Sequence, residues 1–223
     1  MKASTNESLT WSAAQRLLGA GLVNLGQPAR LSAPLLAFLQ LLEKWNAAYN
    51  LTAVREPEKM VTHHLLDSLA VLPYLRGPRV VDVGAGAGIP GIPLALACPE
   101  FEFVLLDSNA KKTRFITQAI HELGLTNVMV ERVRAEDYRP ARLFDTVITR
   151  AFASLAEMLE MTQHLGASDG VFVAMKGNYP QDELMAVPPR FKVNRVEPVQ
   201  VPGLDAQRHV VCLTKVGGPH PTT

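Results

Sequence analysis

Cysteine is scarce in this chain: only Cys98 and Cys212 occur among its 223 residues. The two lie far apart in the sequence, and neither has a partner at the spacing of metal ligands. The sequence therefore indicates neither a disulfide framework nor a zinc site, and we expect two buried free thiols and no bound metal.

Long hydrophobic runs and an excess of one charge are also missing. The first residues hold no apolar core of a signal peptide, and no segment approaches the ~18 apolar residues of a membrane span. We therefore expect a cytoplasmic protein that makes no membrane contact. The formal net charge is +1, which argues against indiscriminate binding of nucleic acid but leaves room for a local basic face.

The length, with 48% hydrophobic and 19% charged residues, suits one α/β domain with a small appendage. Helical spacing of apolar residues predicts three N-terminal helices, over residues 10–24, 31–49 and 57–75. We divide the chain into an N-terminal helical cap (1–76), a core (77–217) and a tail (218–223).

Strands and helices are expected to alternate along the core. The predicted strands cover residues 79–83, 102–107, 127–131, 144–149 and 170–175, and the predicted helices cover 89–97, 111–123 and 154–165. Such alternation predicts parallel strands joined by right-handed crossovers, with a ligand at their carboxyl ends. Two further predicted strands, 191–200 and 208–216, flank a hairpin loop and close the sheet with an antiparallel pair.

A glycine-rich segment follows the first strand of the core. It runs through Asp82 into a turn that contains Gly84, Gly86 and Gly88, and then opens a helix. Glycine accepts positive φ and lets a ligand lie against the backbone, so the segment predicts a cradle for a nucleotide-type cofactor. A purely structural turn is the alternative interpretation.

Two cofactors fit this turn. Gly86, Gly88 and Gly91 also satisfy the G-x-G-x-x-G pattern of dinucleotide binding, which is weak on its own. The charge of Asp82 would repel a pyrophosphate and attract the sulfonium and ammonium groups of S-adenosylmethionine, so we favour the methyl donor. Asp107 ends the second strand, where a carboxylate accepts ribose hydroxyls of either cofactor. A nicotinamide-dependent oxidoreductase remains an alternative, although it lacks a Tyr-x-x-x-Lys pair or a histidine acid.

Several segments together carry a family resemblance over about residues 33–216. They are Trp45-Asn-Ala-Ala-Tyr-Asn-Leu-Thr52, His64-Leu-Leu-Asp-Ser68, Asp82-Val-Gly-Ala-Gly-Ala-Gly-Ile-Pro-Gly-Ile-Pro93, Leu105-Leu-Asp-Ser108, Arg150-Ala-Phe-Ala-Ser154 and Lys176-Gly177. In these segments the chain resembles the ribosomal RNA small subunit methyltransferase G family, also called glucose-inhibited division protein B. The glycine loop alone would indicate only the superfamily, whereas the combination of segments is specific.

The resemblance implies a fold, an activity and a set of cofactor contacts. The fold is α/β, a Rossmann-like class I S-adenosylmethionine-dependent methyltransferase with a mostly parallel seven-stranded sheet, an antiparallel C-terminal hairpin and an N-terminal helical cap. The activity is methylation of guanine N7 at one nucleotide of 16S rRNA, guanine 527. The cofactor contacts that it implies are Gly84, Ile89, the Ala135-Glu136 pair and Arg150. Without the resemblance, Ala135 and Glu136 read equally well as an ordinary acidic start of a helix.

The segment after the fourth strand bears on the atom that is methylated. It reads Arg150-Ala-Phe-Ala, not the Asn/Asp-Pro-Pro-aromatic tetrad associated with exocyclic amines, and no cysteine lies near it as a nucleophile. Guanine N7 carries a lone pair and no proton, so it needs positioning rather than a general base. Arg150 and Lys176 are our catalytic candidates. Their structural alternatives are an ion pair of Arg150 with Asp107 or Glu136, and a solvated strand end for Lys176.

RNA contacts are expected from basic residues at the same edge of the sheet and in the cap. The candidates are Lys111, Lys112, Arg114, Arg55, His63, His64, Arg208 and His209. A run such as Lys111-Lys-Thr-Arg114 also fits a merely solvated helix face. The near-zero net charge favours a folded ribonucleoprotein over naked RNA as substrate, so we expect the partner to be 16S rRNA within the small subunit or an assembly intermediate.

Two further alternatives stay open at this point. One is a methyltransferase acting on a small molecule or a protein, with the N-terminal helices forming a lid over a closed pocket. The other is a non-catalytic RNA-binding protein that keeps the fold, which the intact glycine loop disfavours. We expect the protein to be a monomer.

Overall fold

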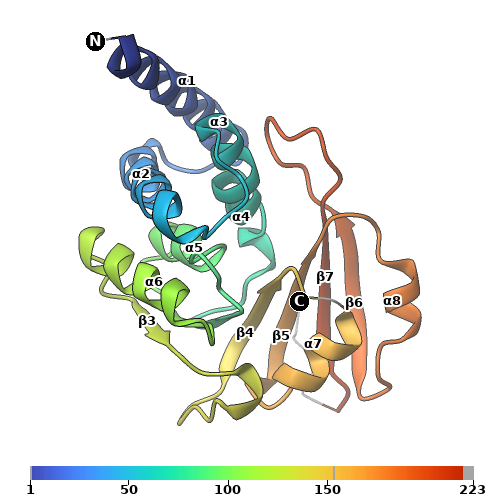
Figure 1. Cartoon of the computed structure of the whole chain (residues 1–223). Coiled ribbons are helices and arrows are strands. Elements are labelled where there is room, and N and C mark those ends of the chain that lie inside the picture. The colour runs from blue at the N-terminus through green and yellow to red at the C-terminus, as the bar shows by residue number, and fades with distance from the viewer. Residues whose placement is uncertain (1, 153, 218–223) are drawn as a thin grey trace.

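The computed structural model describes residues 2–152 and 154–217, which form a helical cap above an α/β sheet (Figure 1). The cap begins with α1 (Lys2–Asn24), a 3₁₀ turn η1 (Ala29–Leu31) and α2 (Ser32–Tyr49). Its third helix is continuous but changes character along its length, from α3 (Pro57–Met60) through the π-helical η2 (Val61–Leu66) to α4 (Asp67–Leu69). The predicted tail, residues 218–223, lies outside the described residues.

The third cap helix ends at Leu69, earlier than the predicted residue 75. Residues 70 and 71 form a turn, and Pro73 lies in the short 3₁₀ helix η3 (Leu72–Tyr74). A proline has no amide proton and its ring crowds the carbonyl four residues earlier, so it disfavours continuation of the helix here. The first helix, in turn, begins well before the predicted residue 10.

The sheet has seven strands in the order β3-β2-β1-β4-β5-β7-β6. They are β1 (Arg79–Val83), β2 (Glu102–Leu106), β3 (Val128–Glu131), β4 (Phe144–Arg150), β5 (Gly166–Lys176), β6 (Phe191–Pro198) and β7 (His209–Lys215). The first five strands pair in parallel, and β7 lies antiparallel between β5 and β6. The predicted mostly parallel sheet with an antiparallel C-terminal hairpin is therefore confirmed.

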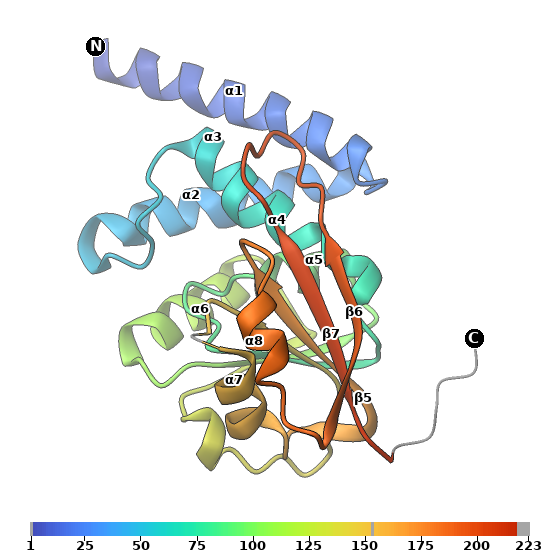
Figure 2. The same ribbon diagram turned by 90° about the vertical axis from the view of Figure 1, so that its right-hand side faces the viewer.

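Helices cover both faces of the sheet (Figures 1 and 2). α5 (Gly91–Ala97) and α6 (Ala110–Glu122) lie on the side of the cap, whereas α7 (Leu155–Thr162) packs on the opposite face. The short α8 (Gln181–Met185) was not predicted, because none of its residues is buried and it carries no apolar period.

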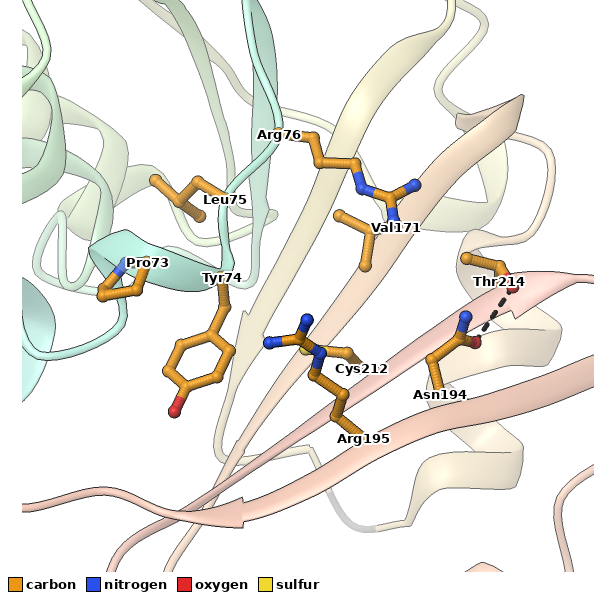
Figure 3. Close-up of a pocket in the computed structure, with 9 residues that line it drawn as sticks. All are labelled: Pro73, Tyr74, Leu75, Arg76, Val171, Asn194, Arg195, Cys212 and Thr214. Carbon is orange, nitrogen blue, oxygen red and sulfur yellow. Dashed lines mark hydrogen bonds between the residues drawn. The ribbon is translucent and has the colours of Figure 1, made fainter. Parts of the chain in front are cut away.

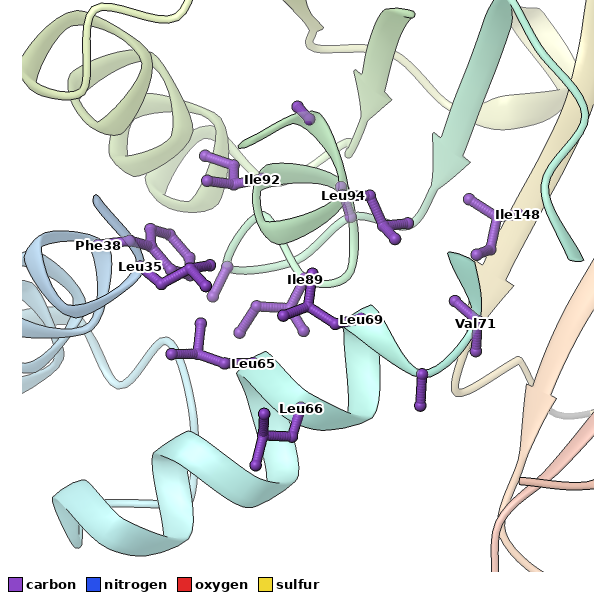
Figure 4. Close-up of a cluster of buried hydrophobic side chains, with 14 of the residues drawn as sticks. Leu35, Phe38, Leu65, Leu66, Leu69, Val71, Ile89, Ile92, Leu94 and Ile148 are labelled. Carbon is purple, nitrogen blue, oxygen red and sulfur yellow. The ribbon is translucent and has the colours of Figure 1, made fainter. Parts of the chain in front are cut away.

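The cap and the sheet share one hydrophobic core. Leu35 and Phe38 of α2 and Leu65 and Leu69 of the third cap helix pack with Ile92 of α5 (Figure 4). Each of these side chains is almost completely buried. Because α5 directly follows the glycine turn, this core fixes the cap against the turn.

The scarce cysteines are free in the structure, with Cys212 buried and Cys98 half-buried. In residues 2–152 and 154–217, no three histidine, cysteine, aspartate or glutamate side chains are grouped as metal ligands would be. A search of the same residues for a helix long and apolar enough to cross a membrane finds none.

Candidate functional site

The glycine turn lies at the carboxyl ends of the parallel strands, between β1 and α5. Gly84, Gly86 and Gly88 have φ values of 73°, 60° and 74°, in the left-handed region that favours glycine. The amides of Gly84 and Ala85 both donate to the Leu106 carbonyl at 2.9 Å, so the turn is held against the end of β2.

A cavity of about 210 Å³ opens beside this turn. Four predicted cofactor residues line it: Gly84, Asp107, Ala135 and Glu136. The rest of the lining consists of Val83, Leu106, Ser108, Val133, Arg134, Phe152 and Met161. The structure thus brings together residues from three separate segments that were predicted to bind one ligand.

Phe152 and Met161 are lining residues that the sequence analysis did not select as ligand contacts. Phe152 follows β4 and Met161 belongs to α7, and both are half-buried. An aromatic ring and a thioether provide an apolar wall suited to a planar base. The aromatic residue within Arg150-Ala-Phe-Ala was the available signal for Phe152. The helical spacing of apolar residues in α7 could not show whether Met161 lines a cavity or packs in the core.

Asp107 is mostly buried and already has protein partners. Its Oδ2 accepts from the Gly86 amide at 2.9 Å, its Oδ1 accepts from the Asn109 amide at 2.8 Å, and Lys112 Nζ lies 3.7 Å away. An ionised carboxylate has about four acceptor positions, so each oxygen can still accept one ligand hydroxyl. Asp107 therefore holds the turn as well as lining the cavity.

Glu136 offers the less occupied carboxylate. It lies in the 3₁₀ turn η4 (Ala135–Asp137), and its Oε1 is 3.7 Å from Arg134 Nη1. Its Oε2 is buried and has no hydrogen-bond partner among the described residues. A buried acceptor without a partner is costly, so this oxygen fits a donor on a bound ligand.

Asp82 supports the turn from behind and does not line the cavity. It is completely buried, and its Oδ2 accepts from the Gly91 amide at 2.8 Å. Burial raises the pKa of Asp82 to about 7, against the opposing effects of the Gly91 hydrogen bond and of Arg150. The expected direct attraction of a cationic cofactor by Asp82 is therefore not supported by its position: the carboxyl group belongs to the scaffold beneath the first turn of α5.

Gly88 and Ile89 are likewise buried beneath the turn. A Cβ on Gly88 would lie 2.8 Å from Cγ1 of Ile92, so this glycine is required for close packing onto α5. Ile89 belongs to the hydrophobic core. Neither lines the cavity, and a direct contact of either with a cofactor stays a prediction.

Arg150 ends β4, and its side chain is 26% exposed. Its Nη1 lies 3.7 Å from Oδ2 of Asp67 in the cap, which is almost fully buried. The partners considered from the sequence, Asp107 and Glu136, are both wrong as counter-ions. Burial lowers the pKa of Arg150, and Asp67 opposes this effect, so the guanidinium remains charged at neutral pH.

Lys176 is not a solvated strand end, because only 11% of its side chain is exposed. Its Nζ lies 2.7 Å from Oε2 of Glu183 in α8 and also donates to the Phe152 carbonyl at 3.3 Å. Glu183 accepts from the Leu155 amide as well. Lys176 thus fastens the segment that carries Phe152, and a catalytic role for it stays a prediction.

His64 is the RNA-contact candidate that the structure contradicts. It is 4% exposed, and its Nε2 lies 2.9 Å from Thr52 Oγ1. Burial, aided by Arg150, lowers the pKa of His64 to about 4. A buried, uncharged imidazole has neither the surface position nor the charge for an ion pair with a phosphate, so the structure places His64 in the interior of the cap rather than at an RNA surface.

The other basic candidates lie at or near the surface. Arg55, Lys111 and Arg114 are exposed, whereas Lys112, Arg208 and His209 are partly covered. Arg208 Nε donates to Asp67 Oδ1 at 2.9 Å. His209 Nδ1 lies 2.8 Å from the Gly177 carbonyl. Their contacts with RNA stay predictions.

A second pocket, of about 310 Å³, contains none of the predicted site residues (Figure 3). It lies between residues 73–76 and strands β5, β6 and β7. It is lined by Pro73, Tyr74, Leu75, Arg76, Val171, Asn194, Arg195, Cys212 and Thr214. Burial raises the pKa of the Cys212 thiol to about 11, so this thiol is unreactive at neutral pH.

Comparisons with solved structures identify the fold. TrmN from Thermus thermophilus aligns with 19% identity and a TM-score of 0.55, covering 70% of this chain and 53% of that protein. An S-adenosylmethionine-dependent methyltransferase from Aquifex aeolicus aligns with 17% identity and a TM-score of 0.54, covering 70% and 92%. At these identities the similarity shows the fold alone, and it confirms a Rossmann-like class I methyltransferase fold.

Comparisons of sequence are more specific. The family model described as rRNA small subunit methyltransferase G matches residues 32–211. The ribosomal RNA small subunit methyltransferase G of Idiomarina loihiensis is 56% identical over 180 residues, which cover 81% of this chain and 87% of the relative. The protein of that name from Ectopseudomonas mendocina is 49% identical over 211 residues, which cover 93% and 99%. The chain therefore belongs to the ribosomal RNA small subunit methyltransferase G family.

Proposed function

We propose that this protein transfers the methyl group of S-adenosylmethionine to N7 of one guanine in 16S rRNA, guanine 527. The observation that carries the proposal is the cavity that joins Gly84, Asp107 and Glu136 at the carboxyl edge of the sheet. A ligand at this edge is the rule for open α/β sheets. Membership of the family supports small-subunit rRNA as the substrate.

The residues of the cavity fit this methyl donor. A Cβ on Gly84 would meet only Phe152, at 3.7 Å, so a ligand can approach the backbone closely at this point. Asp107 and Glu136 offer carboxylate acceptors, and Phe152 and Met161 offer the apolar wall. S-adenosylmethionine supplies an electrophilic methyl group on a sulfonium, ready for in-line transfer to a lone pair.

The chain's own contribution is positioning and charge rather than proton transfer. Guanine N7 has a lone pair in the base plane and no proton to lose, so its methylation requires no general base. Arg150, at the end of β4, provides a planar fork of donors for a guanine edge, a phosphate or a carboxylate. Neither cysteine lies at this strand end, because Cys98 follows α5 and Cys212 is in β7. We place this activity in the cytoplasm, on a monomer acting on the small subunit or its precursor.

Incubation with tritiated S-adenosylmethionine tests the proposal. One reaction contains small subunits that lack the modification, a second contains bare 16S rRNA, and the labelled base is then mapped. We expect label in one 7-methylguanine of the subunit and less label in bare rRNA. Label in a protein or a small molecule, but not in rRNA, would support the rival methyltransferase function instead.

A further inference from the structure

Asp67 joins three parts of the molecule that are distant in sequence. It lies at the start of α4, directly after the π-helical turn, and only 4% of its side chain is exposed. Oδ1 accepts from Arg208 Nε at 2.9 Å, and Oδ2 lies 3.7 Å from Arg150 Nη1. Arg208 ends the loop that leads into β7, and Arg150 ends β4. One buried carboxylate therefore links the cap and the hairpin to the strand end beside the cofactor turn.

The two contacts differ in kind. The short Arg208 contact is a hydrogen-bonded ion pair, whereas the 3.7 Å separation from Arg150 allows an ion pair without a direct hydrogen bond. Arg150 Nη1 is buried and has no hydrogen-bond partner among the residues that the structure describes. Asp67 thus stabilises the charge of Arg150, while this nitrogen donates to no acceptor among the described residues.

The surroundings make Asp67 the main counter-charge of this cluster. Burial raises the pKa of Asp67, and Arg150 and Arg208 oppose that effect. His64, on the same cap helix, has a pKa of about 4 and is neutral at pH 7, and His63 acts on Asp67 only weakly. Asp82 acts on Arg150 from β1, but less strongly than Asp67 does. With two guanidinium groups facing one buried carboxylate, the cluster has positive charge left for an anion.

We propose that Asp67 is a positioning residue for methyl transfer, holding the guanidinium of Arg150 at the carboxyl end of β4 so that its unpaired donor binds an anionic group of the donor or of the RNA. The shared chemistry is an oxyanion, either the carboxylate of S-adenosylmethionine or a phosphate of the RNA. The inference rests on the proposed function, and it gives the His64-Leu-Leu-Asp-Ser68 segment a functional role, the positioning of Arg150 by Asp67.

A double-mutant cycle separates positioning from a merely structural ion pair. The variants are Asp67→Asn, Arg150→Gln and the combination of both, each measured by single-turnover methylation of unmethylated small subunits. We expect Asp67→Asn to slow transfer at least about 10-fold, within the range of couplings between contacting residues. In the Arg150→Gln background the same substitution should cause less than about a two-fold further loss, because Asp67 acts through Arg150.

Two further variants control for folding and charge. Asp67→Glu keeps the carboxylate and should restore part of the transfer. Glu197→Gln weakens a comparable link between distant segments, the 3.0 Å hydrogen bond from Tyr74, and should leave transfer unchanged. If Asp67→Asn alone does not fold, the double variant, which lacks both charged partners, is compared with Arg150→Gln, provided that the two have the same melting temperature. Equal transfer by these two supports the inference.

Affinity measurements then identify the anion. Calorimetry with S-adenosylmethionine alone reports on the carboxylate, and the salt dependence of small-subunit binding reports on a phosphate. Fully additive losses in the cycle, or wild-type transfer by Asp67→Asn, would overturn the inference. A wild-type protein that methylates no rRNA would instead overturn the proposed function, so the two failures are distinguishable.

Discussion

Valine at Gly84 tests the cofactor cradle most sharply, because Gly26 provides a matched control. Both glycines have positive φ, +73° and +65°, and neither has a protein atom that would clash with a Cβ: Gly84 would meet only Phe152 at 3.7 Å, and Gly26 would meet nothing within 4 Å. The two valine variants therefore carry a similar backbone strain. They differ in that Gly84 lines the cavity and Gly26 follows α1.

The expected magnitudes follow from this comparison. A non-glycine residue in the left-handed region costs on the order of 1–3 kcal/mol, which lowers the melting temperature of a chain of this size by roughly 2–4 °C per kcal/mol. Both variants should show this similar loss of stability. Only Gly84→Val should also lose S-adenosylmethionine affinity, by at least about 10-fold, because the valine methyls occupy the space where the ligand meets the backbone.

Calorimetric titration beside a melting curve for each variant checks this prediction. The control is informative because a loss of affinity caused by strain alone would appear in Gly26→Val as well. If Gly84→Val binds S-adenosylmethionine like the wild type, or if both variants lose affinity equally, the cavity beside Gly84 is not the cofactor site.

The same geometry predicts the effects of substitutions at three further residues. Arg150→Ala should slow single-turnover methylation at least about 100-fold, equivalent to about 2.7 kcal/mol of transition-state stabilisation. Arg150→Lys should recover only part of the rate, because the point charge of lysine does not reproduce the planar guanidinium. Near-normal transfer by the alanine variant would show that Arg150 takes no part in the reaction. Asp107→Ala should weaken cofactor binding by ~1.5–3 kcal/mol in calorimetry, the usual range for hydrogen bonds to a charged group, and an unchanged affinity would show that Asp107 only holds the turn. Asp82→Asn should change the pH dependence of stability. Burial raises the pKa of Asp82 in the folded state to about 7, from an ordinary value of 3.8. The folded protein therefore binds the proton more tightly, and the wild type loses stability as pH rises from about 4 to 7. In denaturant unfolding, the free energy of unfolding of the asparagine variant should rise relative to that of the wild type across that pH range, and the difference should become constant above it. Parallel pH profiles of the two proteins would contradict the burial of an ionisable Asp82.

The mostly parallel sheet and its antiparallel C-terminal hairpin were predictable from local patterns. Strand segments such as Val80–Val83, which is apolar except for Asp82, and Phe103–Leu106 are buried on both faces. Their alternation with helices leaves few topologies for a parallel sheet. The cofactor turn was predictable because alternate glycines permit positive φ where other residues are strained, and Gly84 and Gly86 do adopt positive φ.

Long-range pairings could not be read from the sequence. Asp67 and Arg208 are 141 residues apart, and Lys176 finds its counter-ion on α8, which has no apolar period. Sequence alone also does not show that His64 is buried while His63 beside it is half-exposed, because the π-helical turn at Val61–Leu66 departs from the 3.6-residue period. Likewise the charge of Asp82 suggested a ligand contact, yet its strand position places it in the interior.

The most direct test of the central claim is base-resolved mapping of the methyl group that the purified protein adds to small subunits lacking the modification. We expect label at N7 of guanine 527 alone, formed at least about 100-fold more slowly when Arg150→Ala replaces the wild type under the same conditions. Label on another base, on another atom of the same guanine, or on no rRNA at all would contradict it.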